Sequence, residues 1–512
     1  MLSGMKKHIV VDLGDTKKIA VRVYTLYLIN LVVMMGTYVN ILRMHYSMDS
    51  YLAINQNDIS MHILYGRYVS YCFGKFLNSL NISSFQCQTI FAVVIIALTA
   101  VWMTAIEYRI LREMEILHKG RLVAICIAVS IAFVNVAQLE YLFYYPESFA
   151  TMIIPESALY LAILLCTSRT PTVRKYFIGL ALMLIASNGY QIRILIFLSW
   201  AIILIISTSE KGMCRDTVKR IFACGLVAAV AVFLNILLIE FLLKNGIMPA
   251  GNKSLTLSIN TILENAKQLF VNTQVTVMRD GLYLLPKFSI MFTVLMLIGI
   301  LVYMLCHSKK TIAEISVVLL GSICIYLMGY VSHLPITVIW PAPRTMVCIF
   351  IFISSLGVFA TVFASKEAQT YVIALVMLPF LIINFLRINF ITVDLFASNK
   401  IDQELCLAIE NEIERYEERE GVRVENIAME LDMYPKYSYS GIEYAAYEMN
   451  ERGFAIKWSN VAMLNYYTGR NYAKVEMDSD IYKDYFEGKN WDCYSPEDQM
   501  VFVGNTLYLM VY

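Results

Sequence analysis

The sequence predicts a polytopic α-helical membrane protein with about eleven transmembrane helices and a small C-terminal α/β domain outside the membrane. Hydrophobic residues make up 58% of the 512 residues and charged residues only 16%, whereas about a quarter of the residues of a soluble domain are charged. The mean hydropathy is +0.61. Long apolar segments recur along most of the chain, and the last part is polar and acidic.

Eleven apolar segments are candidates for membrane spans. Hydrocarbon about 30 Å thick needs about 20 apolar residues per helix, because backbone polar groups in lipid must be satisfied within the segment. The segments lie near residues 20–43, 85–106, 122–140, 150–167, 174–187, 191–208, 220–243, 287–306, 312–332, 345–364 and 370–391. The fifth is too short for a perpendicular crossing, and Asn188 and Gly189 follow it. It could be half of a broken or re-entrant element.

Basic residues between the segments indicate the orientation. No short apolar region with a cleavage site precedes the first span, so we expect residues 1–20 to be a cytoplasmic leader. In this orientation the cytoplasmic segments carry nineteen Lys and Arg, and the longer external loops carry eleven. The positive-inside rule therefore favours a cytoplasmic N-terminus, and an odd number of spans places the C-terminus outside.

The composition changes abruptly near Asp394. We therefore expect a transmembrane domain over residues 1–394 and a soluble extracytoplasmic α/β domain over residues 395–512, here called the tail. From Asp394 onward the sequence holds 23 of the 40 acidic residues and has a net charge of −12, against +13 for the part before it. A solvated acidic extension is the alternative, but Trp458, Trp491 and many tyrosines would provide a core. Aromatic residues of the tail such as Trp458, Tyr466, Tyr467 and Trp491 are also candidates for recognising glycan, with a place in the core as the alternative role of each.

Local patterns predict the elements of the tail. Apolar residues among many acids over residues 401–420 are typical of an amphipathic helix. Residues 424–431 and 500–512 are rich in β-forming types, and Gly504 followed by Asn505 indicates a turn within the second run.

Several kinds of site lack a signature in the sequence. The eleven cysteines have no zinc or thioredoxin-like spacing, and the six histidines form no metal-ligand cluster. Cys72 with Cys87, or Cys406 with Cys493, could form disulfides outside the cell. We find no glycine-rich phosphate loop, no serine–histidine–acid signature and no basic tract, so no nucleic-acid partner is expected.

Polar and charged residues gather instead at the predicted external ends of the spans. The loop over residues 44–84 carries Asp49, Asp58 and Arg67. Ionisable groups at a membrane are costly and usually face a protein cavity, although a single interfacial Arg or Glu more often stabilises a helix end. Asp49 and Asp58 are the catalytic candidates. The candidates for substrate binding are Arg67, Glu147, Tyr190, Gln191, Arg193, Arg279 and Arg344.

Three short motifs resemble a known family. The run from His45 to Tyr51, HYSMDSY, is followed by Gly66-Arg67 and then by Gly189-Tyr190-Gln191 between two spans. This pattern resembles the bacterial membrane glucosyltransferases that decorate O-antigen, the glucosyltransferase II-like branch of the GT-C superfamily. The resemblance covers residues 20–395. It implies a GT-C-like fold in the bacterial plasma membrane, an essential acid in the first external loop and a polyprenyl-phosphate sugar donor.

The resemblance carries over to individual residues by position. Asp49 matches the first-loop acid, Arg67 the Gly-Arg motif, and Tyr190 with Gln191 the Tyr-Gln motif. The sequence departs from the family at Ser50, because many GT-C enzymes have two adjacent acids there. This departure argues against a paired carboxylate or a metal site.

The chemistry that the resemblance implies is transfer of a monosaccharide, with glucose as the candidate, to a hydroxyl of a cell-surface or lipid-linked glycan. Asp49 would accept the acceptor's proton, with inversion at the anomeric carbon, and Arg67 and Arg344 would stabilise the departing lipid phosphate. A divalent cation, Mg²⁺ or Mn²⁺, shared by Asp49 and Asp58 is left open.

Two other classes of function are kept as alternatives. A glycan flippase, a polymerase or another polytopic transporter would also have charged cavities, but a transporter usually has related halves and polar residues near the bilayer midplane. The sequence has no evident internal repeat. A non-catalytic surface protein that presents the acidic tail would need no polar cluster in the first loop.

Overall fold

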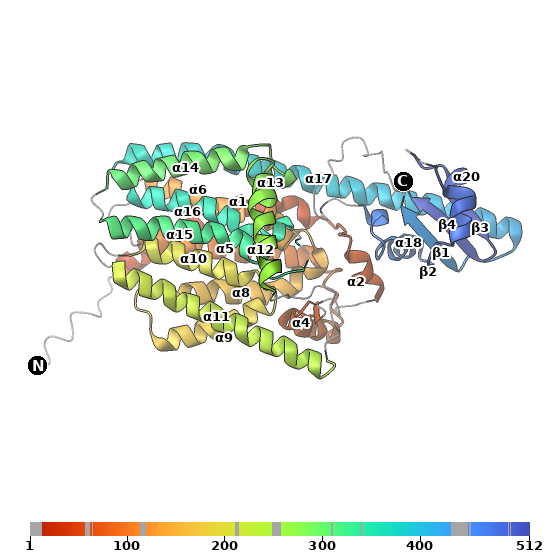
Figure 1. The fold of residues 1–512 in the computed structure, drawn as a ribbon, viewed down its shortest axis with the longest axis horizontal. Helices are drawn as coiled ribbons and strands as arrows, with labels where there is room; N and C mark the ends of the chain where they lie inside the picture. The colour runs from red at the N-terminus through yellow and green to blue at the C-terminus, as the bar shows by residue number, and fades with distance from the viewer. Residues whose placement is uncertain are drawn as a thin grey trace, which may run out of the picture.

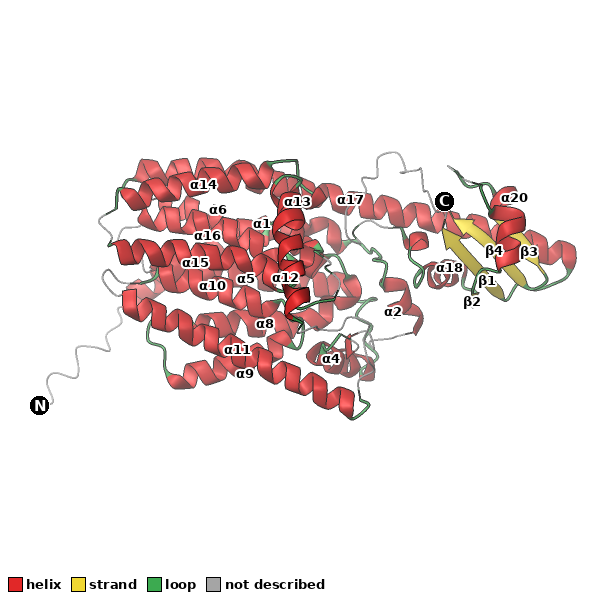
Figure 2. Cartoon of the chain, viewed as in Figure 1, coloured by secondary structure: helices red, strands yellow, loops and turns green. Residues whose placement is uncertain are grey.

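A bundle of long apolar helices forms most of the protein, and a small sheet lies beyond one end of it (Figures 1 and 2). The computed structural model describes residues 13–56, 62–63, 65–112, 119–209, 214–247, 258–308, 311–337, 339, 341–431, 449, 452–489, 491 and 493–511. We call the end of the bundle near the sheet the tail end. The first helix of the bundle finishes there, and the last one leaves the bundle there (Figure 1).

Each of the eleven predicted spans contains a helix in the described residues. These helices are α1 (Leu13–Tyr38), α5 (Gln88–Arg112), α6 (Lys119–Phe133), α8 (Phe149–Cys166), α9 (Val173–Ser187), α10 (Arg193–Ser207), α11 (Cys214–Lys244), α14 (Ser289–Cys306), α15 (Ile312–Val331), α16 (Val347–Phe363) and α17 (Glu367–Glu420). The order along the chain is the predicted one.

Not all of these helices are long and apolar enough to cross a bilayer on their own. Seven of them are. Helix α6 and the following segment, Val136–Phe143, are bent by 42° relative to each other, and they make an eighth span if the pair crosses the membrane as one. Helices α10 and α16 are apolar but shorter, and α9 has only 15 residues. The protein is therefore a polytopic helical membrane protein, while the count of eleven spans stays a prediction.

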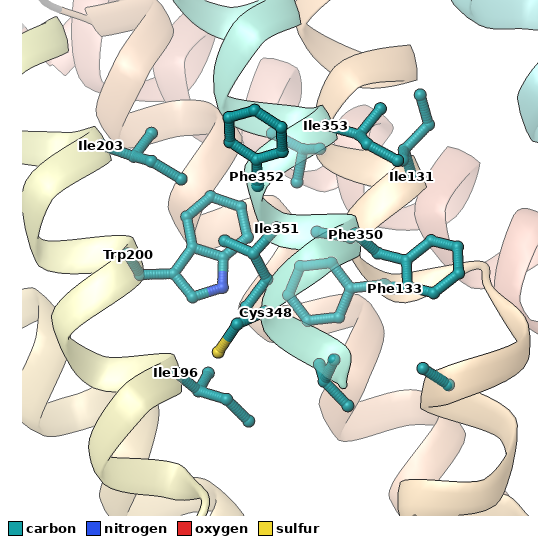
Figure 3. Close-up of a cluster of buried hydrophobic side chains, with 14 of the residues drawn as sticks. Ile131, Phe133, Ile196, Trp200, Ile203, Cys348, Phe350, Ile351, Phe352 and Ile353 are labelled. Atoms are coloured by element: carbon teal, nitrogen blue, oxygen red, sulfur yellow. The ribbon is translucent and has the colours of Figure 1, made fainter. Parts of the chain in front are cut away.

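The interior of the bundle lies where α6, α10 and α16 meet (Figure 3). Figure 3 shows Trp200 of α10 facing Phe133 of α6, and their ring centroids are 5.9 Å apart. Helix α16 is buried along most of its length, because it is apolar on every side. Helices in lipid associate mainly through close packing and small residues. Gly357 is one such residue, since a Cβ there would lie 2.3 Å from Met377 of α17.

Short elements cluster at the tail end. The loop after α1 and η2 (Val39–Leu42) contains α2 (Ser50–Gln56) and α4 (Tyr68–Ser79). Helices α12 (Ile259–Gln268) and α13 (Gln274–Met278), joined by η5 (Leu269–Thr273), run across the direction of the bundle (Figure 1). The remaining short elements are α7 (Val136–Gln138), η3 (Leu139–Phe143), η4 (Pro146–Ser148), η6 (Gly281–Tyr283) and η7 (Pro343–Thr345).

Helix α17 is continuous across residue 394 and carries the chain from the bundle into the tail (Figure 1). It ends at Gly421, which has a φ of +67°, a backbone conformation that favours glycine after a helix. The predicted helix over residues 401–420 is thus confirmed as the last part of α17. The expected domain boundary falls inside this helix, and an independently folding tail stays a prediction.

The tail contains a four-stranded sheet in the order β2-β1-β4-β3. Strand β1 (Asn426–Leu431) is parallel to β2 (Ala473–Val475) and β4 (Thr506–Val511), and β4 is antiparallel to β3 (Met500–Val503). The predicted strands and the turn at Gly504, with a φ of +60°, are confirmed. The helical elements around the sheet are η8 (Gly453–Ala455), α18 (Asn460–Thr468), α19 (Ser479–Ile481), η9 (Tyr482–Phe486) and α20 (Pro496–Gln499).

The two tail tryptophans differ in their surroundings. Trp491 is 8% exposed and belongs to the core between α17 and the sheet, as predicted. Trp458 is 51% exposed, so the prediction that it contributes to the core is wrong. All eleven cysteines are free thiols, including the two pairs considered for disulfides.

Candidate functional site

Asp49 lies at the start of α2, in a turn that two serines stabilise. The backbone N–H of Ser47 donates to Ser50 Oγ at 2.9 Å, and the backbone N–H of Asp49 donates to Ser47 Oγ at 3.2 Å. The Asp49 carbonyl accepts from Ala53 N at 3.2 Å, which begins the helix. Short hydroxyl side chains that bond the backbone are favoured at such helix starts.

A second carboxylate joins this turn from a distant part of the chain. Glu147, in η4 before α8, accepts hydrogen bonds from Ser50 Oγ at 2.8 Å and from Ser47 Oγ at 3.2 Å. Burial raises the pKa of the Glu147 carboxyl, and the nearby charge of Asp49 raises it further. The expectation that this chain lacks a paired carboxylate therefore needs correction, because the second acid comes from another loop and Ser50 helps to hold it.

The Gly-Arg and Tyr-Gln motifs meet at a second position of the tail end. The guanidinium carbon of Arg67 lies 4.6 Å from the ring centroid of Tyr190 and 5.5 Å from that of Tyr65. Gln191 Nε2 donates to the Tyr65 carbonyl at 2.9 Å. Gly66, with a φ of +69°, turns the chain here, and a Cβ on it would lie 3.1 Å from the Ile239 side chain.

Arg67 lies among other cations. Arg344 and Arg193 are near enough for their charges to lower the pKa of Arg67, although burial is the largest cause of that lowering. Burial and the charge of Arg67 also lower the pKa of His62 to about 3, so this ring is neutral at neutral pH. In the described part of the chain, Arg67 has no carboxylate partner, and its Nε is buried without a hydrogen bond.

Arg344 has a fixed position. Its guanidinium forms an ion pair with the fully buried Glu140 and donates to the Tyr145 hydroxyl at 3.0 Å. Its backbone N–H also donates to Glu140, at 2.7 Å. Glu140 and Tyr145 lie a few residues before Glu147. One short stretch of chain therefore holds Arg344 on one side and the turn of Asp49 on the other.

Arg193 is inside the bundle. Its side chain is fully buried and forms an ion pair with Glu156 at 2.9 Å. Tyr141 donates to the same carboxylate oxygen at 2.8 Å, and Arg193 Nη2 contacts Met152 Sδ at 3.1 Å. This arrangement gives Arg193 a role in joining α10 to α8, and it acts on Arg67 through its charge.

We expect Glu156→Ala to destabilise the protein by about 3–5 kcal/mol, because the change leaves the Arg193 charge buried and unpaired. Thermal unfolding of the purified protein in detergent measures the loss. Glu240→Ala is the matched control, since Glu240 is exposed and its pair with Lys244 is 3.9 Å long. Equal melting temperatures of the Glu156 variant and the wild type would contradict this role.

Two further candidates lie apart from these groups. Arg279 follows α13, is 56% exposed and pairs with Asp280 at 2.8 Å. Asp58 lies outside the described residues. The described residues contain no group of three or more His, Cys, Asp or Glu that could hold a metal ion.

Sequence reasoning missed several contacts in the site. Ser47 and Ser50 were visible in the HYSMDSY motif, but nothing near them indicated Glu147 as their partner. Glu140 stood near a span end, yet its pair with Arg344 joins residues 204 positions apart. Trp458 Nε1 donates to Asp49 Oδ1 at 3.1 Å across 409 positions.

Comparison with known families identifies the chain. A family model described as glucosyl transferase GtrII matches residues 38–393, which include Asp49, Arg67, Tyr190 and Arg344. No curated protein and no solved structure matches. The match spans well over half of the chain and agrees with the resemblance seen in the short motifs. The chain therefore belongs to the glucosyl transferase GtrII family.

Proposed function

We propose that the protein transfers glucose from a polyprenyl-phosphate donor to a hydroxyl group of a cell-surface or lipid-linked glycan at the tail end of the bundle. The family match gives glucosyl transfer. The observation that carries the choice of donor is Arg67, a partly buried guanidinium beside Tyr190 that lacks a carboxylate partner among the described residues. The positive charges of Arg344 and Arg193 lie near that of Arg67. This arrangement favours binding of an anion, and the phosphate of the donor supplies one.

Arg67 and Arg344 bind the phosphate of the donor in this proposal. Guanidinium groups hold phosphate oxygens through two parallel hydrogen bonds, and their charges stabilise the negative charge that grows on the leaving phosphate. Tyr190 and Gln191 hold the Arg67 turn in place through the ring contact and the bond to Tyr65. A lipid phosphate that leaves from the membrane surface needs no nucleotide pocket.

Asp49 is the general base. The acceptor oxygen forms a bond to the anomeric carbon, the bond from that carbon to the phosphate oxygen breaks, and the electron pair leaves with the lipid phosphate. Asp49 takes the hydroxyl proton, and the anomeric configuration inverts. Glu147 positions Asp49, since it binds both serines of the turn that carries the base.

The location follows from the same proposal. The carboxylates, Arg67 and the tail lie at one end of the bundle, and the positive-inside count assigns this end to the outer face of a bacterial plasma membrane. The N-terminus is then cytoplasmic and the C-terminus extracytoplasmic. Residues 1–394 form the catalytic part, with a GT-C-like arrangement, and residues 395–512 form the extracytoplasmic part.

The glucose content of the surface glycan tests the function. Cells that carry the gene should contain a glucose substituent that is missing from cells without it, and the wild-type gene on a plasmid should restore it. Unchanged composition together with a changed glycan chain length would indicate a polymerase and contradict the proposal. Accumulation of lipid-linked glycan on the cytoplasmic side of the membrane in cells without the gene would indicate a flippase.

A further inference from the structure

An exposed tryptophan of the tail contacts the carboxylate of Asp49. The indole N–H of Trp458 donates to Asp49 Oδ1 at 3.1 Å, and half of the Trp458 side chain is open to solvent, at 51% exposure. The neighbouring residues Ser459 and Asn460 are buried. The buried residues that follow Trp458 and the hydrogen bond to Asp49 hold the indole ring next to the carboxylate of Asp49, the candidate base.

The tail is attached to the Asp49 loop by several other bonds. The hydroxyl groups of Tyr46 and Tyr466 are 3.0 Å apart, and those of Tyr51 and Tyr467 are also 3.0 Å apart. The four rings contact one another, with the Tyr46 and Tyr51 rings stacked at 5.2 Å. Tyr51 also packs into the core of the tail. The sequence interval between these partners exceeds 400 residues.

Two contacts fix the direction of the tail. The backbone N–H of Tyr46 donates to Asn399 Oδ1 of α17 at 2.9 Å, and Asn399 Nδ2 donates to the Tyr46 carbonyl at 3.0 Å. Asp402 of the same helix forms an ion pair with Arg452 and accepts from Gly453 N at 2.8 Å, a few residues before Trp458. The segment of Trp458 is therefore tied to a helix that continues into the bundle.

We propose that Trp458 forms an acceptor subsite, on which a sugar ring of the glycan acceptor stacks so that its hydroxyl group reaches Asp49. This inference rests on the proposed function and adds the place where the acceptor binds. The apolar face of a sugar ring matches the flat face of an indole, and a tryptophan whose N–H is already bonded loses little conformational freedom on binding. The contact to Asp49 orients the ring and the base together.

The net charge of the tail agrees with this kind of ligand. The tail, with a net charge of −11, repels anionic lipids and polymers, whereas the stacking of a neutral sugar ring on an aromatic face does not depend on charge. The other aromatic candidates are occupied. Tyr466 and Tyr467 bond Tyr46 and Tyr51, and Trp491 is in the core.

The test measures acceptor and donor binding separately on the full-length protein in detergent. The acceptor probe is the surface glycan extracted from cells that lack the gene, and the donor probe is undecaprenyl phosphate. We expect Trp458→Ala to weaken acceptor binding and to raise the acceptor KM by at least about tenfold, as truncation of a central aromatic contact does. Binding of undecaprenyl phosphate should be unchanged.

A second variant separates stacking from the bond to Asp49. Trp458→Phe keeps an aromatic face and loses the N–H donor, so acceptor binding should largely survive. The acid limb of the kcat profile should move to higher pH, because the lost hydrogen bond stabilised the ionised carboxylate and its removal raises the pKa of the base.

Tyr485→Ala is the matched control for Trp458→Ala, since Tyr485 is a tail aromatic that is 46% exposed and lies in η9.

Equal acceptor binding by wild type and Trp458→Ala would overturn the subsite. So would an equal loss in the Tyr485 control, which would indicate general damage to the tail. Failure of the proposed function is a different result, because binding of the glycan is measured without transfer. If undecaprenyl phosphate fails to bind while Trp458→Ala still abolishes glycan binding, the donor proposal falls and the acceptor subsite stands.

Discussion

Asp49→Asn is expected to lower the rate of glucose transfer by at least about 100-fold, the contribution of a well-placed general base. The amide has nearly the same shape as the carboxylate and can still accept the bond from Trp458, but it cannot take the acceptor's proton. Expression, membrane insertion and glycan binding should therefore be preserved. Transfer assays on purified protein, with protein amount normalised by immunoblot, measure the effect.

Glu240→Gln is the control for this substitution, because Glu240 is an exposed acid at the C-terminal end of α11. Its activity should equal that of the wild type. Full activity of the Asp49 variant would assign the role of the base to Glu147, which shares the turn, or to Asp58. The corresponding Gln and Asn variants of those two residues then decide between them.

Arg67→Ala is expected to abolish nearly all binding of a polyprenyl-phosphate sugar, and Arg67→Lys to keep part of it. A planar guanidinium bonds two phosphate oxygens at once, whereas an ammonium group acts as a point charge. The same order is expected at Arg344, but Arg344→Ala also leaves Glu140 buried without its cation. Arg67 therefore gives the cleaner result. Titration of the donor lipid into protein in detergent measures the affinity.

Lys75→Ala is the matched control for Arg67, since Lys75 is an exposed cation on α4 of the same loop. Its donor affinity should be that of the wild type. Equal affinity in wild type, Arg67→Ala and Arg344→Ala would remove both arginines from the donor site. A similar loss in the Lys75 variant would show that general positive charge attracts the lipid, without a defined phosphate site.

Local patterns in the sequence predicted much of the fold. Runs of apolar residues predicted the positions of the bundle helices, because a helix in lipid must be apolar over its whole length. The strands around Gly504 and the helix over residues 401–420 followed from the alternation and turn signals. Continuity of α17 through residue 394 was not predicted, since the change in composition there resembles a boundary although the helix does not end.

The site was predicted as single residues and not as contacts. Asp49 and Arg67 became candidates because each is a charged residue next to a span. The partner of Ser47 and Ser50 was not found, because Glu147 reaches them from the start of another helix and local pattern carries no information on such distances. Arg193 stood beside Tyr190 and Gln191 in sequence, but the start of α10 turns it inward to Glu156.

The most direct test of the central claim uses purified protein in proteoliposomes with two radiolabelled donors, undecaprenyl-phosphate glucose and a nucleotide-activated glucose. The acceptor is the glycan extracted from cells that lack the gene. Label from the lipid donor should move to the glycan in the wild type, with the anomeric configuration inverted, and should stay on the lipid in Asp49→Asn. Transfer from the nucleotide sugar alone, or equal transfer by the Asp49 variant, would contradict the account.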